Sequence, residues 1–225
     1  WHVKIRMCIL YTNNELKCAG DEWGRQEETT DSINGIDWDA ITPINLGTGV
    51  FAKKVTCAQD YCCVITNADK VKCWGRNNKG TLGYEDKTDR GPNNANTMGD
   101  NLLDIDLGDD DRVIDISASD GDMFGRGKTC AVLWNGDVKC WGKNLRYEAS
   151  DKPCGSLGIS GLGADEIIGD AANEMGSNLA KVPLGRKATE ISCGGHSLAS
   201  RCSALLDNGQ VGVWGFGLCV GNLNL

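Results

Sequence analysis

The sequence lacks an excess of basic residues and any long hydrophobic run. Its 23 Lys and Arg residues stand against 31 Asp and Glu residues, which gives a formal net charge of −8. A nucleic-acid-binding protein needs a basic surface to displace the counterions of the phosphates, so this class is excluded, and acidic lipid surfaces are disfavoured likewise. No apolar segment approaches the roughly 18 residues of a membrane-spanning helix, so we expect no membrane insertion.

Histidine is scarce as well, which leaves little material for catalysis. Only His2 and His196 are present. A nucleophile, base and orienting group built around a histidine would have to use one of these two residues. His2 lies near the start of the chain and is uninformative, so with so few histidines we expect a protein that is not an enzyme.

The cysteines lack the Cys-x-x-Cys spacing of zinc knuckles and of thiol–disulfide oxidoreductases. Zinc is therefore the weaker interpretation, and redox catalysis is disfavoured. There are 12 cysteines, an even number, which indicates a disulfide framework formed in an oxidising compartment. We expect an extracellular or secreted protein, and we interpret the chain, which shows no export signal, as a mature protein or a fragment. No Asn-x-Ser/Thr sequon occurs.

What the chain does contain is an internal repeat. The stretches CILYTNNELKCAG, CVITNADKVKCWG, CAVLWNGDVKCWG and SALLDNGQVGVWG begin at residues 8, 63, 130 and 203. Their last glycines, at positions 20, 75, 142 and 215, are 55, 67 and 73 residues apart. Periods of this length are typical of β-propellers and repeat arrays, and the high glycine content, 30 of 225 residues, predicts frequent turns.

Each repeated stretch predicts a β-hairpin, with two short strands around Asn, Asp or Gly. A three-residue turn with Gly136 in the left-handed conformation would place Cys130 directly opposite Cys140, near disulfide distance. The other ten-residue offsets predict the bridges Cys8–Cys18 and Cys63–Cys73. The fourth copy has Ser203 and Val213 instead, so both cysteines of the pair are lost together.

A second set of cysteines precedes the hairpins of repeats two and four. Cys57 and Cys62 precede one, and Cys193 and Cys202 precede the other, while repeats one and three lack both members. Adjacent Cys62 and Cys63 point to opposite faces of a strand, which predicts that they belong to different bridges. The two remaining cysteines lie in loops and either pair with each other or form intermolecular bonds: Cys154 and Cys219.

The run CWGRNNKGTLG at residues 73–83, the segment ISCGGHS at 191–197 and the hairpin at 130–142 together resemble the regulator of chromosome condensation repeat family. The resemblance covers all four units and implies a β-propeller, usually of seven blades. It also implies that His196 hydrogen-bonds between neighbouring strands. We therefore predict an all-β propeller, one domain over residues 1–225, with approximate repeats at 1–46, 47–107, 108–184 and 185–225.

The sequence departs from the family pattern in three places. Ala19 replaces the tryptophan in repeat one, RYEASDKPC interrupts repeat three, and repeat four stops soon after Trp214. Four units are also fewer than seven, so we expect a fragment or a partial ring. The stretch 147–177 is interpreted as an ordered surface loop, because its glycines make a helix unfavourable.

Candidate contact residues lie in the turns and insertions. Trp134 sits at a hairpin tip, where a large ring is hard to bury, and Arg126 lies in an insertion, so both are candidate partner contacts. Asp109, Asp110 and Asp111 are weak calcium candidates. A solvated turn is the favoured interpretation of these carboxylates, because no EF-hand spacing is present, and no cofactor is expected.

Three functions follow from these observations. The leading hypothesis is a non-catalytic, disulfide-stabilised extracellular propeller that binds another protein or copies of itself in an assembly. Glycan recognition is the alternative, through exposed tryptophans and asparagines such as Asn77, Asn78, Asn93, Asn94 and Asn96. Guanine-nucleotide exchange on a small GTPase is implied only by the family resemblance, and the cysteines argue for a different compartment.

Overall fold

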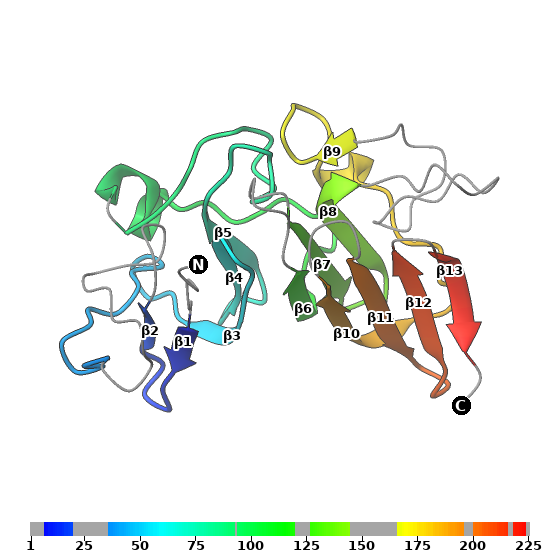
Figure 1. Ribbon diagram of the computed structural model, residues 1–225, viewed down its shortest axis with the longest axis horizontal. Coiled ribbons are helices and arrows are strands. Elements are labelled where there is room, and N and C mark those ends of the chain that lie inside the picture. Colours follow the sequence, from blue (N-terminus) through cyan, green and yellow to red (C-terminus); the bar gives the residue numbers. More distant parts are fainter. Residues whose placement is uncertain are drawn as a thin grey trace.

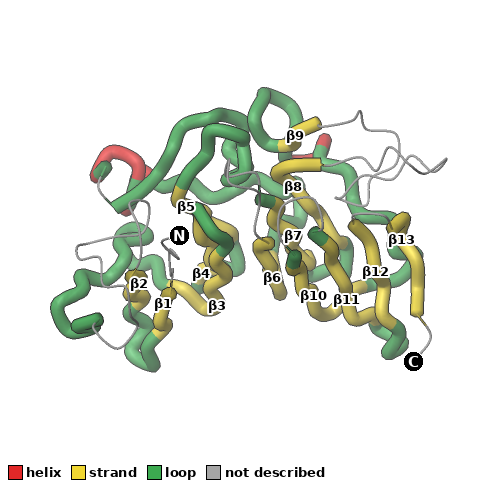
Figure 2. Tube along the Cα trace, in the orientation of Figure 1, coloured by secondary structure: helices red, strands yellow, loops and turns green. Residues whose placement is uncertain are grey.

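The computed structural model describes residues 7–19, 36–92, 94–119, 127–144, 166–195, 200–215 and 218–223. The regular secondary structure of these residues is β-strand, apart from 3-10 turns at η2 (Ala95–Thr97), η3 (Gly99–Asn101) and η4 (Gly176–Asn178), and long loops connect the strands (Figure 2). Four antiparallel sheets lie side by side in an arc that does not close (Figure 1). The prediction of an all-β, propeller-type partial ring is confirmed.

We call the sheets blades A to D in chain order, and each one falls within one predicted repeat. Within each blade the strands are arranged in chain order from the inner edge to the outer edge. The inner strands of blades B, C and D pack beside one another. The strands are β1 (Met7–Leu10) and β2 (Leu16–Ala19) in blade A; β3 (Ala52–Cys57), β4 (Tyr61–Thr66) and β5 (Val71–Gly75) in blade B; β6 (Val113–Ser119), β7 (Lys128–Leu133), β8 (Val138–Asn144) and β9 (Glu166–Ile168) in blade C; and β10 (Ala188–Gly194), β11 (Arg201–Leu206), β12 (Val211–Gly215) and β13 (Leu218–Leu223) in blade D.

The four hairpins share one turn geometry. Each has a three-residue loop whose third residue is left-handed, at Asn14 (φ 69°), Asp69 (φ 61°), Gly136 (φ 87°) and Gly209 (φ 83°). The predicted turn at Gly136 is therefore confirmed. Because an odd loop places the flanking residues in direct register, Cys130 lies opposite Cys140.

Gly136 and Gly209 give a matched test of this turn. Alanine at either position must adopt an unfavourable positive φ, which costs about 1 kcal/mol of stability. At Gly136 an added Cβ would also lie 2.4 Å from Cβ of Lys187, whereas nothing lies within 4 Å of the Cβ position at Gly209. We expect Gly136→Ala to lower the free energy of unfolding by at least about 1 kcal/mol more than Gly209→Ala. Urea unfolding of the two variants measures this difference, and equal losses would contradict it.

The predicted disulfides form in five of the six pairs. The hairpin pairs Cys8–Cys18, Cys63–Cys73 and Cys130–Cys140 have S–S distances of 2.07, 2.05 and 2.11 Å. The pairs between inner strand and hairpin, Cys57–Cys62 and Cys193–Cys202, have distances of 2.13 and 2.00 Å. The remaining prediction, Cys154 with Cys219, is not tested, because Cys154 and the Cys219 side chain lie outside the described residues.

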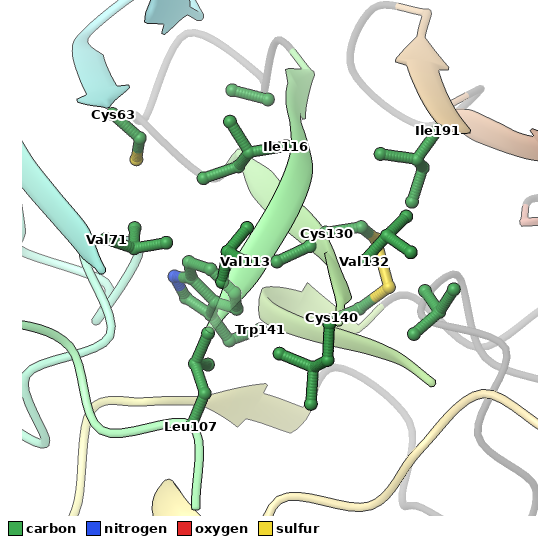
Figure 3. Packing of buried hydrophobic residues seen from close by; sticks show 14 of the residues in the cluster. Cys63, Val71, Leu107, Val113, Ile116, Cys130, Val132, Cys140, Trp141 and Ile191 are labelled. Atoms are coloured by element: carbon green, nitrogen blue, oxygen red, sulfur yellow. A yellow bond between two sulfur atoms is a disulfide. The ribbon is translucent and has the colours of Figure 1, made fainter. Parts of the chain in front are cut away.

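The blades pack through tryptophans and these disulfides. Trp74, Trp141 and Trp214 occupy the same position in blades B, C and D, and each is 0% exposed. Figure 3 shows the ring of Trp141 beside Val113, and the Cys130–Cys140 bond beneath Val132. Blade A has the smaller Ala19 at this position, and a second cluster of buried residues joins it to blade B.

Side-chain oxygens connect the inner strands from blade to blade. Thr56 Oγ1 on β3 accepts a hydrogen bond from the backbone N–H of Ala118 on β6, at 3.0 Å. Ser117 Oγ on β6 accepts one from the N–H of Cys193 on β10, at 2.8 Å. The buried carboxylate of Asp115 forms an ion pair with Lys54 of blade B and accepts a hydrogen bond from Ile191 N–H of blade D, at 2.7 Å. Blades B, C and D are therefore fixed relative to one another.

Candidate functional site: the hairpin tips

Backbone hydrogen bonds hold the hairpin turns of blades B, C and D in place, and those of blades B and C are also bonded to the next blade. Within a blade, the first loop residue donates its N–H to the residue before the inner strand, as in Trp134 to Arg112 O at 2.8 Å. Between blades, the last loop residue accepts from the next inner strand, as in Ala188 N–H to Gly136 O, also at 2.8 Å. Asp69 and Val113 repeat this contact between blades B and C at 2.7 Å. The tips therefore form a pre-ordered surface.

Trp134 stands out on this surface. Its side chain is 63% exposed, and the corresponding first loop residues of the other blades are Thr12, Asn67 and Asp207. The guanidinium carbon of Arg112 lies 5.1 Å from the centroid of the indole ring, within cation–π range. The predicted exposure of Trp134 is therefore observed, although its role as a partner contact remains a prediction.

Two further residues complete what we call the tip site, defined as Asp110, Arg112, Ile114 and Trp134. Asp110 Oδ1 accepts a hydrogen bond from Arg112 Nε at 3.2 Å, which orients the guanidinium group. Ile114 is 39% exposed and occupies the bulge at the start of β6, opposite the strand that leads into Trp134. Sequence reasoning did not identify Arg112 or Ile114. The strand register between β6 and β7 would have identified them, because it places residues 112–114 beside the hairpin tip.

Two of the three calcium candidates form ion pairs with different basic side chains. Asp110 faces Arg112, and Asp111 forms an ion pair with Lys70 of blade B. In the described part of the chain, the groups of ligand atoms close enough to share a metal consist of cysteines that are already in disulfides. Asp109, Asp110 and Asp111 therefore do not bring three ligand atoms close enough together, within the described ranges, to share one ion.

Of the other candidate residues, Asn77 and Asn94 have defined hydrogen-bond partners, and four lie outside the described residues. Asn77 is buried, donates to the backbone and side chain of Asp86, and accepts from Leu82 N–H, so it is not available to a glycan. Asn94 caps η2 by accepting from Asn96 N–H. The positions outside the described residues are His2, Asn93, Arg126 and His196.

A buried lysine lies between blades C and D. Lys128 is 2% exposed, and its Nζ donates to the backbone oxygen of Ser200 at 3.3 Å. Burial lowers the pKa of Lys128 from 10.5 to about 7, because removal from water disfavours the charged form. The neighbouring hydroxyls of Ser119 and Ser200 hydrogen-bond to each other at 2.8 Å. We interpret this group as part of the blade interface.

No helix within the described ranges has the length and apolar character needed to cross a bilayer. This finding concerns only the helical segments, all of which are short 3-10 turns.

Comparisons with known proteins identify the fold. Neither protein-family profiles nor curated protein sequences gave a match. Among solved structures, the chain is similar to yeast RCC1 (Prp20) in its complex with Kap60, with a TM-score of 0.55 and 20% identity. It is similar to human WBSCR16 with a TM-score of 0.58 and 15% identity, and to Prp20p from Saccharomyces cerevisiae with a TM-score of 0.53 and 19% identity.

These alignments cover nearly all of this chain and about half of each neighbour. They span 94, 97 and 94% of the present residues, and 42, 50 and 43% of RCC1 (Prp20), WBSCR16 and Prp20p respectively. The identities are too low to transfer an activity, but the geometry agrees over the whole arc. The chain therefore has the fold of a cysteine-rich RCC1-like β-propeller, of which it forms a partial ring.

Proposed function

We propose that this chain is a non-catalytic, extracellular protein-binding module whose tip site contacts the partner. The exposed Trp134 ring, held against Arg112, is the observation that carries the proposal. Tryptophan and arginine are the residues most enriched at the energetic centres of protein interfaces. Because Arg112 is itself oriented by Asp110 and the hairpin is tied down by backbone hydrogen bonds, little ordering is needed on binding.

Two further observations support this function. Disulfides persist in oxidising compartments, and five cross-strand bridges suit a scaffold that works outside the cell. The structural neighbours include a protein solved in complex with Kap60 and one whose binding to Gsp1p and histones was described. Those partners belong to the neighbours, and they support for this chain only the general use of the fold in protein recognition.

The test uses a displayed library of secreted protein domains, selected for binding to the oxidised chain. We expect most of the selected domains to lose at least about tenfold in affinity for Trp134→Ala, since a central aromatic anchor contributes roughly 2 kcal/mol or more. Arg112→Ala should reduce affinity for the same domains.

The control is Leu103→Ala, which truncates another exposed side chain (66%) outside the tip site. It should leave the affinities unchanged. Selected domains that bind Trp134→Ala as well as the unmodified chain would contradict the assignment of the tip site.

A further inference from the structure

Two of the contacts between blades bring two disulfides together, and therefore four cysteines. We propose that, when these disulfides are reduced, each group of four thiolates binds one Zn²⁺ ion. The A/B cluster consists of Cys8, Cys18, Cys57 and Cys62, and the C/D cluster consists of Cys130, Cys140, Cys193 and Cys202. This inference concerns the reduced form of the chain and does not depend on the tip site.

The sulfur atoms of different disulfides are spaced like the ligands of a tetrahedral zinc site. In the A/B cluster, Cys8 Sγ lies 3.4 Å from Cys57 Sγ and 3.8 Å from Cys62 Sγ. In the C/D cluster, Cys130 Sγ lies 3.7 Å from Cys202 Sγ. Three sulfurs of each cluster lie within 4.8 Å of one another. Zinc–sulfur bonds of about 2.3 Å at tetrahedral angles place the sulfurs about 3.8 Å apart, so the sulfurs that are not bonded to each other already lie near the edges of such a tetrahedron.

The contact between blades B and C provides an internal comparison. The hairpin disulfide of blade B, Cys63–Cys73, faces blade C, and strand register places Ala118 and Thr129 where blades B and D carry their second pair of cysteines. Thr129 Oγ1 lies 4.0 Å from Cys63 Sγ. A hairpin disulfide therefore packs between blades beside a threonine, and the bridging of the hairpins does not by itself account for the two clusters of four.

Each cluster is closed on one side and accessible on the other. Cys18 and Cys62 are 1% exposed, whereas Cys8 and Cys57 are half-buried. In the C/D cluster, Cys193 is the half-buried member. Structural zinc sites are closed by four protein ligands, and the half-buried sulfurs give a reductant and then the ion a path to the site.

The disulfides and the zinc complex are alternative states of the same cysteines. A dithiol reductant opens each disulfide by exchange, which transfers two electrons and leaves two thiols and the disulfide of the reductant. A phosphine with one water also leaves two thiols, together with phosphine oxide. Zn²⁺ then displaces the four protons of a cluster, because the thiolate is the ligand.

The metal would connect the chain differently from the disulfides. Each disulfide joins two strands of one blade, whereas a zinc ion in either cluster would join two blades. This arrangement also explains why the sequence has no Cys-x-x-Cys knuckle, because the ligands are cross-strand pairs from neighbouring blades. The local spacing that disfavours zinc in the sequence therefore does not exclude it from the fold.

Metal titration of the chain reduced with a phosphine tests the assignment. We expect one Zn²⁺ ion per cluster in the reduced chain and no comparable binding by the oxidised chain. Co²⁺ in place of Zn²⁺ should bind with the same stoichiometry and give the visible absorption of tetrahedral thiolate coordination. Zn²⁺ should also raise the midpoint of thermal unfolding of the reduced chain, because the assembled site exists only in the folded state.

Paired variants separate the clusters from cysteines in general. Cys57→Ala with Cys62→Ala should remove one bound ion of the reduced chain. Cys63→Ala with Cys73→Ala removes the same number of thiols from the contact between blades B and C, so it is the matched control and should leave both ions bound. Equal losses of metal in the two variants would mean that the thiols bind as ligands of an unfolded chain, and would overturn the proposal.

The converse variant builds a third cluster. Ala118→Cys with Thr129→Cys places two thiols on blade C beside the hairpin pair of blade B, at the register positions that the second cysteine pair has in blades B and D. The reduced variant should bind one Zn²⁺ ion more than the unmodified chain. A fully reduced, unmodified chain that binds no Zn²⁺ would overturn the proposal and show that the paired disulfides only pack against each other.

Discussion

Replacing Cys130 and Cys140 together by alanine is expected to lower the free energy of unfolding by about 3 to 5 kcal/mol. Closing a loop of about ten residues accounts for roughly 2.7 kcal/mol of this through the entropy of the unfolded chain. The remainder comes from packing, because both residues are 0% exposed and Cys130 Sγ lies 3.7 Å from Cys202 Sγ of the next disulfide. Urea unfolding without reductant, followed by tryptophan fluorescence, measures the loss.

Blade D provides the reciprocal experiment. Ser203 and Val213 face each other in the register that Cys63 and Cys73 have in blade B. The double variant Ser203→Cys, Val213→Cys should form a new bridge and raise stability by about 2 to 3 kcal/mol. Its reduced form should show no such gain. If removing the bridge in blade C changed stability by less than about 1 kcal/mol, the view that disulfides stabilise this fold would be wrong.

The disulfide framework was predictable because register is a local property. A ten-residue offset around a three-residue turn determines which residues face each other, and the joint absence of cysteines at positions 203 and 213 revealed the pairing. The tryptophans that pack between blades also recur at one place in the repeat, because each of Trp74, Trp141 and Trp214 precedes the last glycine of its repeated stretch.

The tip site was only half predictable. Trp134 could be placed at a turn from the sequence, but its contact with Arg112 depends on a hydrogen bond between segments 22 residues apart. The acidic stretch around residue 110 suggested metal binding or solvation, whereas the folded chain supplies separate cations from blade B and from Arg112. Such pairings depend on tertiary structure, which composition does not reveal.

Other features were hidden for similar reasons. β9 lies in a stretch that the sequence predicts to be a surface loop. This strand was missed because only three residues pair with the edge of β8, too few to show an alternating pattern. Asn77 resembled an exposed turn residue, yet its side chain satisfies the backbone of the segment after blade B.

The stability of the fold should rise between pH 7 and pH 10 because of Lys128. The pKa of this residue is about 7 in the folded chain, since burial disfavours the charged ammonium, and 10.5 is its ordinary value. Between these two pH values the unfolded chain binds one more proton than the folded chain. Raising the pH therefore favours the folded state, by at most about 1.4 kcal/mol per pH unit, and by roughly 3 to 5 kcal/mol in all.

Lys128→Met isolates this contribution. The variant keeps most of the buried volume and removes the titrating group, so it should be more stable than the unmodified chain at pH 7, with the difference shrinking toward pH 10. Loss of the hydrogen bond to Ser200 O opposes this gain by about 1 kcal/mol at every pH, so it leaves the slope unaffected. Lys181→Met, at a side chain that is 66% exposed, is the control and should retain the pH dependence of the unmodified chain. Parallel stability curves for Lys128→Met and the unmodified chain would show that Lys128 stays protonated in the blade interface, and that the surrounding groups offset the cost of burying its charge.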